Sequence, residues 1–194
     1  MVLYTKLALA DEFRRQAERK PIDKITVREL VAATQMNPKT FYYHFGGIAD
    51  LMKWFLERDM NALFDGKVIS AGDDWYEAVL EIMDYISDNR RILKSIAESK
   101  YWPEMRFFLC SMYERYIAEL LRGVIARVES EDGVPTKLSA ADFELNVSFY
   151  GLLFYSAAER WFFDGMKVPK EEYLQSCIKI VGHENMYDAI RRFR

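Results

Sequence analysis

The stretch that decides the fold reads Ile25-Thr26-Val27-Arg28-Glu29-Leu30-Val31-Ala32-Ala33-Thr34-Gln35-Met36-Asn37-Pro38-Lys39-Thr40-Phe41-Tyr42-Tyr43-His44-Phe45. Its pattern predicts two short helices joined by a tight turn. Thr26 precedes a helical run and has Glu29 three residues later, which is the spacing of a capping box. Apolar side chains then recur at helical spacing at Val27, Leu30 and Val31, so one face of the first helix is predicted to face a core.

The second helix has two sides that differ in chemistry. Asn37 followed by Pro38 is typical of a helix start, because asparagine caps the first turn and proline at the first helical position loses no hydrogen bond. Phe41 and Phe45 share one face at i, i+4. The other side carries hydrogen-bonding tips on short or rigid stems: Lys39, Thr40, Tyr42, Tyr43 and His44. Such tips suit phosphate oxygens and base edges in the major groove of DNA, but a surface helix whose tyrosines pack onto a neighbouring helix has the same pattern.

This part of the sequence resembles the helix-turn-helix signature of the tetracycline-repressor (TetR) family of transcriptional regulators. The likeness lies in Leu30-Val31-Ala32-Ala33 and in Thr40-Phe41-Tyr42-Tyr43-His44-Phe45. It extends back through Ala10-Asp11-Glu12-Phe13 and Ile25-Thr26-Val27 and forward to Asp50-Leu51, about the first quarter of the chain. The resemblance implies a DNA-binding head followed by a helical body that binds an effector and forms a homodimer.

Two positions depart from the family pattern. Gln35 stands where many members have a turn glycine, so the turn is expected to hold a side chain in a left-handed conformation at some cost. Ile48 stands where members commonly have a lysine that contacts phosphate, so that contact is not carried over. The run from Gln35 to Phe45, with Asn89-Arg90-Arg91 later, is also similar to the subgroup that includes the dihydroxyacetone-kinase activator.

The resemblance and the chemistry of the tips together name the residues that are predicted to contact a palindromic operator in double-stranded DNA. They are Thr26 and Arg28 on the second helix of the chain, and Asn37, Lys39, Thr40, Tyr42, Tyr43 and His44 on the third. Lys39 and Thr40 are the predicted base readers, and Tyr43 and His44 are predicted to hold phosphates.

The composition and charge of the chain are consistent with DNA binding but do not by themselves predict it. The 194 residues are 51% hydrophobic and 29% charged, which is enough apolar content for a core and too much for disorder. Residues 1–45 carry eight Lys and Arg against five Asp and Glu, so a head of charge +3 precedes a body of −6 within a chain of −3. A basic head on an acidic body is expected of a regulator that touches DNA, although solvated helices show similar imbalances.

The rest of the chain predicts an all-α fold, because Gly and Pro are sparse (9 and 5) and apolar residues recur at helical spacing. The predicted domains are residues 1–47, a helix-turn-helix DNA-binding domain, and residues 48–194, a helical effector-binding and dimerisation domain. The predicted helices outside the quoted stretch are residues 3–20, 48–65, 74–88, 89–98, 103–128, 140–164 and 169–181, and a short turn of helix near the C-terminus. Loops are expected at 66–74 and 129–138.

The helix over 140–164, with Ser139 as its cap, is apolar on nearly every side, which is more than one core-facing stripe explains. Gly151 and nearby small residues would let another helix approach closely. With 169–181 it is predicted to form a four-helix dimer interface; the alternative is a helix buried wholly inside its own subunit. The predicted interface residues are Phe154, Ala157, Ala158, Trp161 and Ile178.

An unidentified small-molecule effector is implied by the resemblance, because bodies of this family hold a cavity. The candidate ligand-binding residues are the Met and aromatic side chains Tyr85, Trp102, Met105, Phe108, Met112 and Tyr150. Such residues at helical spacing also make plain core, so both interpretations stay open.

Catalytic and metal-binding patterns are not found in the sequence, so no enzyme activity, cofactor or metal is predicted. His44 and His183 lie far apart, and no phosphate-cradling glycine loop or dinucleotide fingerprint occurs. Cys110 and Cys177 have no metal spacing and are expected to be reduced, buried thiols in a cytoplasmic protein. No apolar run is long enough to span a membrane.

Two rival functions come from other classes. The first is a helical co-regulator of TetR-like shape that binds a protein partner and not DNA, which the apolar Ile48 and the modest head charge would favour. The second is an α-helical enzyme, which the missing catalytic patterns disfavour. Salt-dependent binding to duplex DNA distinguishes the regulator from the first rival.

Overall fold

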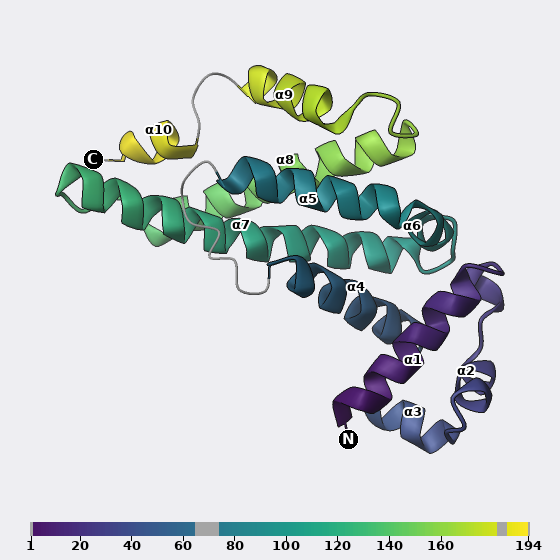
Figure 1. The fold of residues 1–194 in the computed structure, drawn as a ribbon. Coiled ribbons are helices and arrows are strands. Elements are labelled where there is room, and N and C mark those ends of the chain that lie inside the picture. Colours follow the sequence, from purple (N-terminus) through teal and green to yellow (C-terminus); the bar gives the residue numbers. More distant parts are fainter. Residues whose placement is uncertain (1, 65–73, 182–185, 194) are drawn as a thin grey trace. The chain divides into compact units, whose positions relative to one another are not determined.

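The computed structural model describes residues 2–64, 74–181 and 186–193, and every regular element within these ranges is helical (Figure 1). This confirms the all-α prediction. Residues 66–73 of the expected loop and Gly182-His183 lie outside the described residues. The helices are α1 (Val2–Ala17), the 3₁₀ turn η1 (Ile22–Lys24), α2 (Val27–Ala33), α3 (Pro38–His44), α4 (Ile48–Phe64), α5 (Asp74–Asp88), α6 (Arg90–Ala97), α7 (Trp102–Asp132), α8 (Ala140–Phe163), α9 (Lys170–Val181) and α10 (Met186–Arg191).

The chain divides into two compact units. The first comprises Met1–Ala62 and Asn89–Phe108, and the second comprises Leu63–Asp88 and Leu109–Arg194. This division differs from the boundary expected after residue 47. The head, residues 1–47, shares its unit with most of α4 and with the α6 segment, which we define as residues 89–108.

Two hydrogen bonds join the head to the α6 segment within the first unit. Nη2 of Arg14 on α1 donates to Oδ1 of Asn89, which is buried just before α6, at 2.6 Å. The backbone N–H of Lys100, just after α6, donates to the carboxylate of Asp23 in η1 at 3.1 Å. The head is therefore bonded at both ends of α6, which explains why this later segment belongs to its unit.

The core of the first unit draws side chains from the head, from α4 and from the α6 segment. The rings of Phe13 on α1 and Phe55 on α4 meet edge to face with centroids 6.1 Å apart. Burial of such side chains supplies most of the driving force for folding a unit of this size. Its completely or almost completely buried side chains include Leu9, Phe13, Leu30, Phe41, Leu51, Phe55, Ile96 and Met105.

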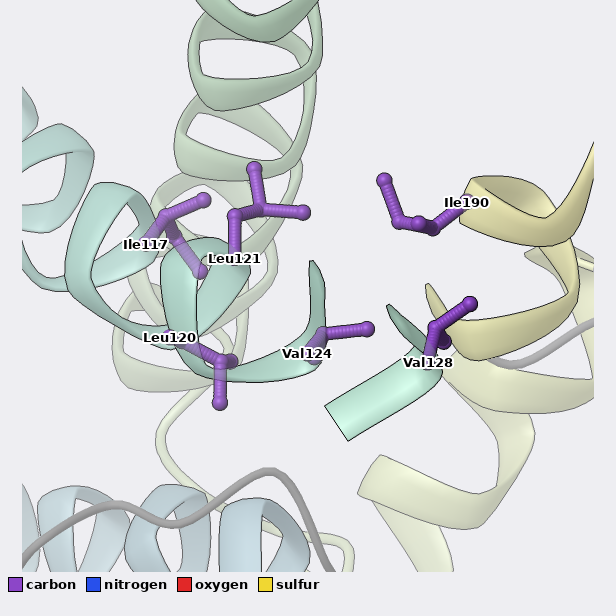
Figure 2. Packing of buried hydrophobic residues seen from close by; sticks show 6 residues of the cluster. All are labelled: Ile117, Leu120, Leu121, Val124, Val128 and Ile190. Atoms are coloured by element: carbon purple, nitrogen blue, oxygen red, sulfur yellow. The ribbon is translucent and has the colours of Figure 1, made fainter. Parts of the chain in front are cut away.

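The second unit has two apolar clusters. In the first, five side chains of α7 lie with Ile190 of α10: Ile117, Leu120, Leu121, Val124 and Val128 (Figure 2). In the second, Leu80 and Met83 of α5 pack with Trp161 of α8 and Leu174 of α9. Helix α8 contributes to both clusters, because Phe154 packs against the first. One side of α8 therefore packs in the core of the second unit.

The end of α7 lies four residues beyond the expected position. Arg127 and Glu131, one turn apart, form an ion pair at 2.8 Å that stabilises the last turn. Gly133 then ends the helix with φ 68°, a left-handed conformation that glycine adopts without steric cost. The polar run 129–138 was expected to be a loop, but its first four residues are helical.

The start of α8 is as predicted. Ser139 accepts a hydrogen bond from the Asp142 N–H at 3.1 Å, and the Asp142 carboxylate accepts from the Ser139 N–H at 3.4 Å. This reciprocal pair is a capping box, and it satisfies two backbone groups that the first turn cannot pair.

Helices α7 and α8 approach closely at Gly151. A Cβ atom at this position would lie 2.8 Å from Cγ and 3.2 Å from Cα of Glu114 on α7. The small residue therefore accommodates a helix of its own subunit.

The Gly151→Ala variant is expected to be less stable by about 1–3 kcal/mol, because the added methyl group forces α7 and α8 apart. Urea denaturation measures the change. Ser156→Ala, at an exposed position of α8, is the matched control and should change stability by less than about 0.5 kcal/mol. Equal stability of wild type and Gly151→Ala would contradict the close approach.

Candidate nucleic-acid interface

The start of α2 is held by a capping box. The Thr26 side chain accepts a hydrogen bond from the Glu29 N–H, while the Glu29 carboxylate accepts from the Thr26 N–H at 3.0 Å and from the Thr26 hydroxyl at 2.8 Å. Lys20 also donates to Glu29, at 2.7 Å. Hydrogen bonds from Lys20 and then from Thr26 lower the pKa of Glu29 to about 2. The polar groups of Thr26 are therefore engaged within the head, whereas Arg28 beside it is exposed.

The turn between α2 and α3 contains the expected left-handed residue. Gln35 has φ 55°, and the Met36 N–H donates to the Val31 carbonyl at 2.8 Å, which closes the end of α2. A residue with a Cβ atom in this conformation costs roughly 1–2 kcal/mol relative to the right-handed one. The left-handed conformation expected at Gln35 is therefore confirmed.

Helix α3 is fixed at its start and along one side. Asn37 is its N-cap and Pro38 its first residue, as the sequence predicts. Phe41 and Phe45 are buried, with ring centroids 5.6 Å apart. Burial of these two rings determines which side of α3 faces away from the core.

The polar tips of α3 lie on its outer side. Lys39 is exposed, and Tyr42 and Tyr43 are 59% and 78% exposed. Thr40 and His44 are half-buried, and the ring of His44 lies edge-on to Tyr43 at 4.9 Å between centroids. This surface combines a cation, a hydroxyl, phenols and an imidazole, and these are groups that hydrogen-bond to phosphates and base edges.

The start of α4 offers no cation to this surface. Ile48 is its first residue and is buried, so it contributes to the core of the head. The Gly46 N–H donates to the Asp50 carboxylate at 3.0 Å, which ties the preceding loop to the first turn of α4. Asp50 in turn lies 3.7 Å from Lys53.

Several cations of the head are engaged by its own carboxylates. Arg15 forms a pair with Glu12 at 2.6 Å, and Lys20 with Glu29 at 2.7 Å. In contrast, Lys39 makes no ion pair with any residue that the structure describes. Lys39 on α3 is therefore a cation whose charge a phosphate or a base can meet without breaking an existing pair.

Of the five predicted dimer residues, Phe154, Trp161 and Ile178 pack against apolar clusters of the second unit, and Ala157 and Ala158 are half-buried. Trp161 is 4% exposed, and its Nε1–H donates to the Val168 carbonyl at 2.8 Å. The Ala157 carbonyl accepts from the Tyr173 hydroxyl at 3.0 Å. Ile178 packs against the cluster of Trp161, and Phe154 packs against the α7 cluster. Trp161 is therefore a core side chain, which the sequence did not distinguish from a surface one.

The exposed apolar stripe of α8, which we define as Leu145, Phe149 and Leu152, lies on the helix predicted to form a dimer interface, but its residues are not among the predicted interface residues. These side chains are 69%, 61% and 57% exposed and follow one helix face at i, i+4 and i+7. The signal was present as helical spacing. It was hidden because apolar residues fill nearly every side of α8.

The six candidate effector-binding residues are divided between the two units. Trp102, Met105 and Phe108 belong to the first unit, and Tyr85, Met112 and Tyr150 belong to the second. Met105 and Met112 are buried core side chains, and the other four are half-buried.

A tyrosine that the sequence analysis did not select also lies in the second unit. The ring of Tyr113 meets Tyr155 edge-on at 5.7 Å, and burial raises the pKa of Tyr113. Its phenol therefore stays protonated to a higher pH than that of an exposed tyrosine.

Other chemical features are sparse in the described part of the chain. Cys110 and Cys177 form no disulfide, and both are half-buried, whereas buried thiols were predicted. Within the described residues, His, Cys, Asp and Glu side chains form no group that could hold a metal ion. None of the described helices combines the length and the apolar character that crossing a membrane requires.

Comparison with known proteins places both parts of the chain. The family model of bacterial regulatory proteins, tetR family, matches residues 11–53, and that of a transcriptional regulator C-terminal region (TetR_C_8) matches residues 73–183. No curated protein matches the chain. Among solved structures, the chain is similar to the dihydroxyacetone kinase operon activator DhaS, with a TM-score of 0.66, 14% identity and 99% of each chain covered. At this identity the likeness to DhaS shows a shared fold alone.

Gln35→Gly is expected to stabilise the chain by up to about 1 kcal/mol, because relief of the left-handed strain exceeds the entropy that glycine loses on folding. Chemical denaturation measures the change. Ala32→Gly, at an exposed position inside α2, should destabilise by about 1 kcal/mol, as glycine does in a helix. If both variants were destabilised equally, strain at Gln35 would be ruled out.

Proposed function

Because the chain belongs to the TetR family of transcriptional regulators, we propose that it binds an operator in double-stranded DNA as a homodimer, under the control of a small-molecule effector or a partner. The observation that carries the proposal is the two-sided character of α3. Phe41 and Phe45 are buried, whereas Lys39, Tyr42 and Tyr43 are exposed. A helix held in this way presents its polar tips to a major groove.

The proposed roles follow from the hydrogen-bonding groups. Lys39 carries three N–H donors and suits the O6 and N7 acceptors of guanine. Tyr43 and His44 lie together at the end of α3 and suit phosphate oxygens. Arg28 at the start of α2 is exposed and suits a second phosphate. Thr26 serves chiefly to hold α2 in place, because Glu29 engages its hydroxyl.

Dimerisation is supported by the exposed apolar stripe of α8. Contiguous exposed apolar side chains on a soluble protein mark interaction sites, and a second copy would cover the stripe with the same three residues. A two-fold dimer would present two α3 helices to half-sites about 34–36 Å apart, or a multiple of that.

Effector control is supported by the family and by the aromatic and Met-rich body. Of the six candidates, the half-buried Tyr85, Trp102, Phe108 and Tyr150 offer more accessible surface than the two buried methionines. Regulated binding would appear as a change in operator affinity when cell-extract metabolites are added.

Selection of bound sequences from random duplex DNA tests the function directly. The wild type should enrich a palindrome, and its affinity should fall steeply with salt, because each phosphate contact contributes a slope of roughly −0.9 to log K against log salt. A protein that engages a protein partner instead of DNA would enrich no sequence.

Two variants of α3 separate base reading from phosphate binding in the same selection. Lys39→Ala should change the preferred sequence and lose about 1–3 kcal/mol at the base pair that it reads. His44→Ala should weaken binding roughly equally on all sequences. Lys167→Ala, at an exposed lysine of the second unit, is the control and should leave binding unchanged. A sharp change of specificity in His44→Ala would contradict its role.

Phe149→Asp combined with Leu152→Asp should yield monomers by analytical ultracentrifugation at concentrations where the wild type is a dimer. The added carboxylates would be desolvated without partners in the interface. Phe107→Asp is the matched control, because Phe107 is 79% exposed and lies outside the stripe. Persistence of the dimer in the double variant would exclude this face.

A further inference from the structure

The N-cap of α3 makes two hydrogen bonds to the same downstream residue. Oδ1 of Asn37 accepts from the backbone N–H of Thr40 at 2.8 Å. It also accepts from the hydroxyl of Thr40, with Oγ1 at 3.1 Å. The first bond is the ordinary capping contact, and the second orients a side chain on the outer side of α3.

The capping bond settles the direction of the second bond. A backbone N–H can only donate, so the atom of Asn37 that faces it is the amide oxygen. An amide oxygen can only accept, so the Thr40 hydroxyl has to donate its single hydrogen to it. The hydroxyl is then left with lone pairs alone for any other partner.

We propose that Asn37 fixes Thr40 as a hydrogen-bond acceptor and thereby makes Thr40 a reader of an exocyclic amino group in the major groove. The inference rests on the proposed DNA binding and adds which atom is read. In the major groove the amino groups are N6 of adenine and N4 of cytosine, and the other polar atoms at the base edges are acceptors. A free threonine hydroxyl pairs with either kind of atom, whereas an oriented one discriminates between them. Asn37 is a positioning residue in this assignment.

The neighbouring residue has the opposite polarity. Lys39 is exposed and has only donors, so it suits the acceptors O6 and N7 of guanine. Lys39 and Thr40 therefore require different atoms from the bases they meet. If the base pairs read by Lys39 and Thr40 were exchanged, the Lys39 donors would face an amino group and the Thr40 acceptor would face a base acceptor.

The experiment uses the operator obtained by selection and deletes single atoms from it. Thr40→Val keeps the shape of the side chain and removes the hydroxyl, so the base pair whose preference it abolishes is the one that Thr40 reads. At that pair, purine replaces adenine, or pyrimidin-2-one replaces cytosine, and each lacks the amino group. Deleting the amino group should lower the affinity of the wild type about tenfold, as expected for one base contact. The same deletion should leave the affinity of Thr40→Val unchanged.

Variants of Asn37 then test the positioning role. Asn37→Asp keeps both acceptor bonds, so the dependence of affinity on the amino group should remain. Its negative charge should weaken binding to all sequences. Asn37→Gly removes the oxygen but is a tolerated N-cap that costs only a few tenths of a kcal/mol in helix stability. In Asn37→Gly the hydroxyl is free to donate, so the loss caused by deleting the amino group should shrink. Circular dichroism checks that both variants fold.

The outcomes separate the two proposals. Three results would each overturn the assignment of Thr40. The first is that deleting the amino group leaves the affinity of the wild type unchanged. The others are that the deletion lowers the affinity of Thr40→Val as much as that of the wild type, or that it lowers the affinity of folded Asn37→Gly by the full wild-type factor. Failure of the wild type to bind any duplex would instead overturn the proposed function.

Discussion

Burial of Phe41 and Phe45 is the constraint on which the candidate interface depends. Each ring contributes about 1.5–3 kcal/mol by leaving water. Phe41 lies within the seven-residue helix α3, and Phe45 is the C-cap that follows it. Turning α3 about its axis would expose the rings and bury polar groups of Lys39 or Tyr43 without partners, which costs several kcal/mol more. The outward direction of the polar tips is therefore a consequence of core packing, and the chemistry of the surface follows from that packing.

A long-range hydrogen bond to Asn89 links the head to the α6 segment. Asparagine before a helix normally caps it, at a gain of about 1 kcal/mol, yet the side chain of Asn89 makes no capping bond to α6. It accepts instead from Arg14 of α1, and a hydrogen bond to a charged donor contributes about 1.5–3 kcal/mol. The stronger long-range bond prevails over the local one. It ties the start of α6 to α1 of the head.

Local rules were enough to predict the features of this chain that depend on neighbours in sequence. The capping box at Thr26 and Glu29, the cap at Asn37 and the left-handed Gln35 are each set by residues within one turn. The division after residue 47 was expected from the end of the signature. The Arg14–Asn89 bond, which ties the α6 segment to the head, joins residues 75 apart, and no local pattern shows that separation.

The faces of α8 show the same limit for a different reason. In a helix with one apolar stripe, the spacing of the apolar residues shows which side is buried. Because α8 is apolar on almost every side, this spacing does not identify its buried face. Trp161 and Leu152 are equally apolar in the sequence. Trp161 is buried because Val168, in the turn before α9, supplies a carbonyl for its Nε1–H, whereas Leu152 faces outward. Which side of α8 stays exposed is therefore decided by the other helices of the second unit that pack against it.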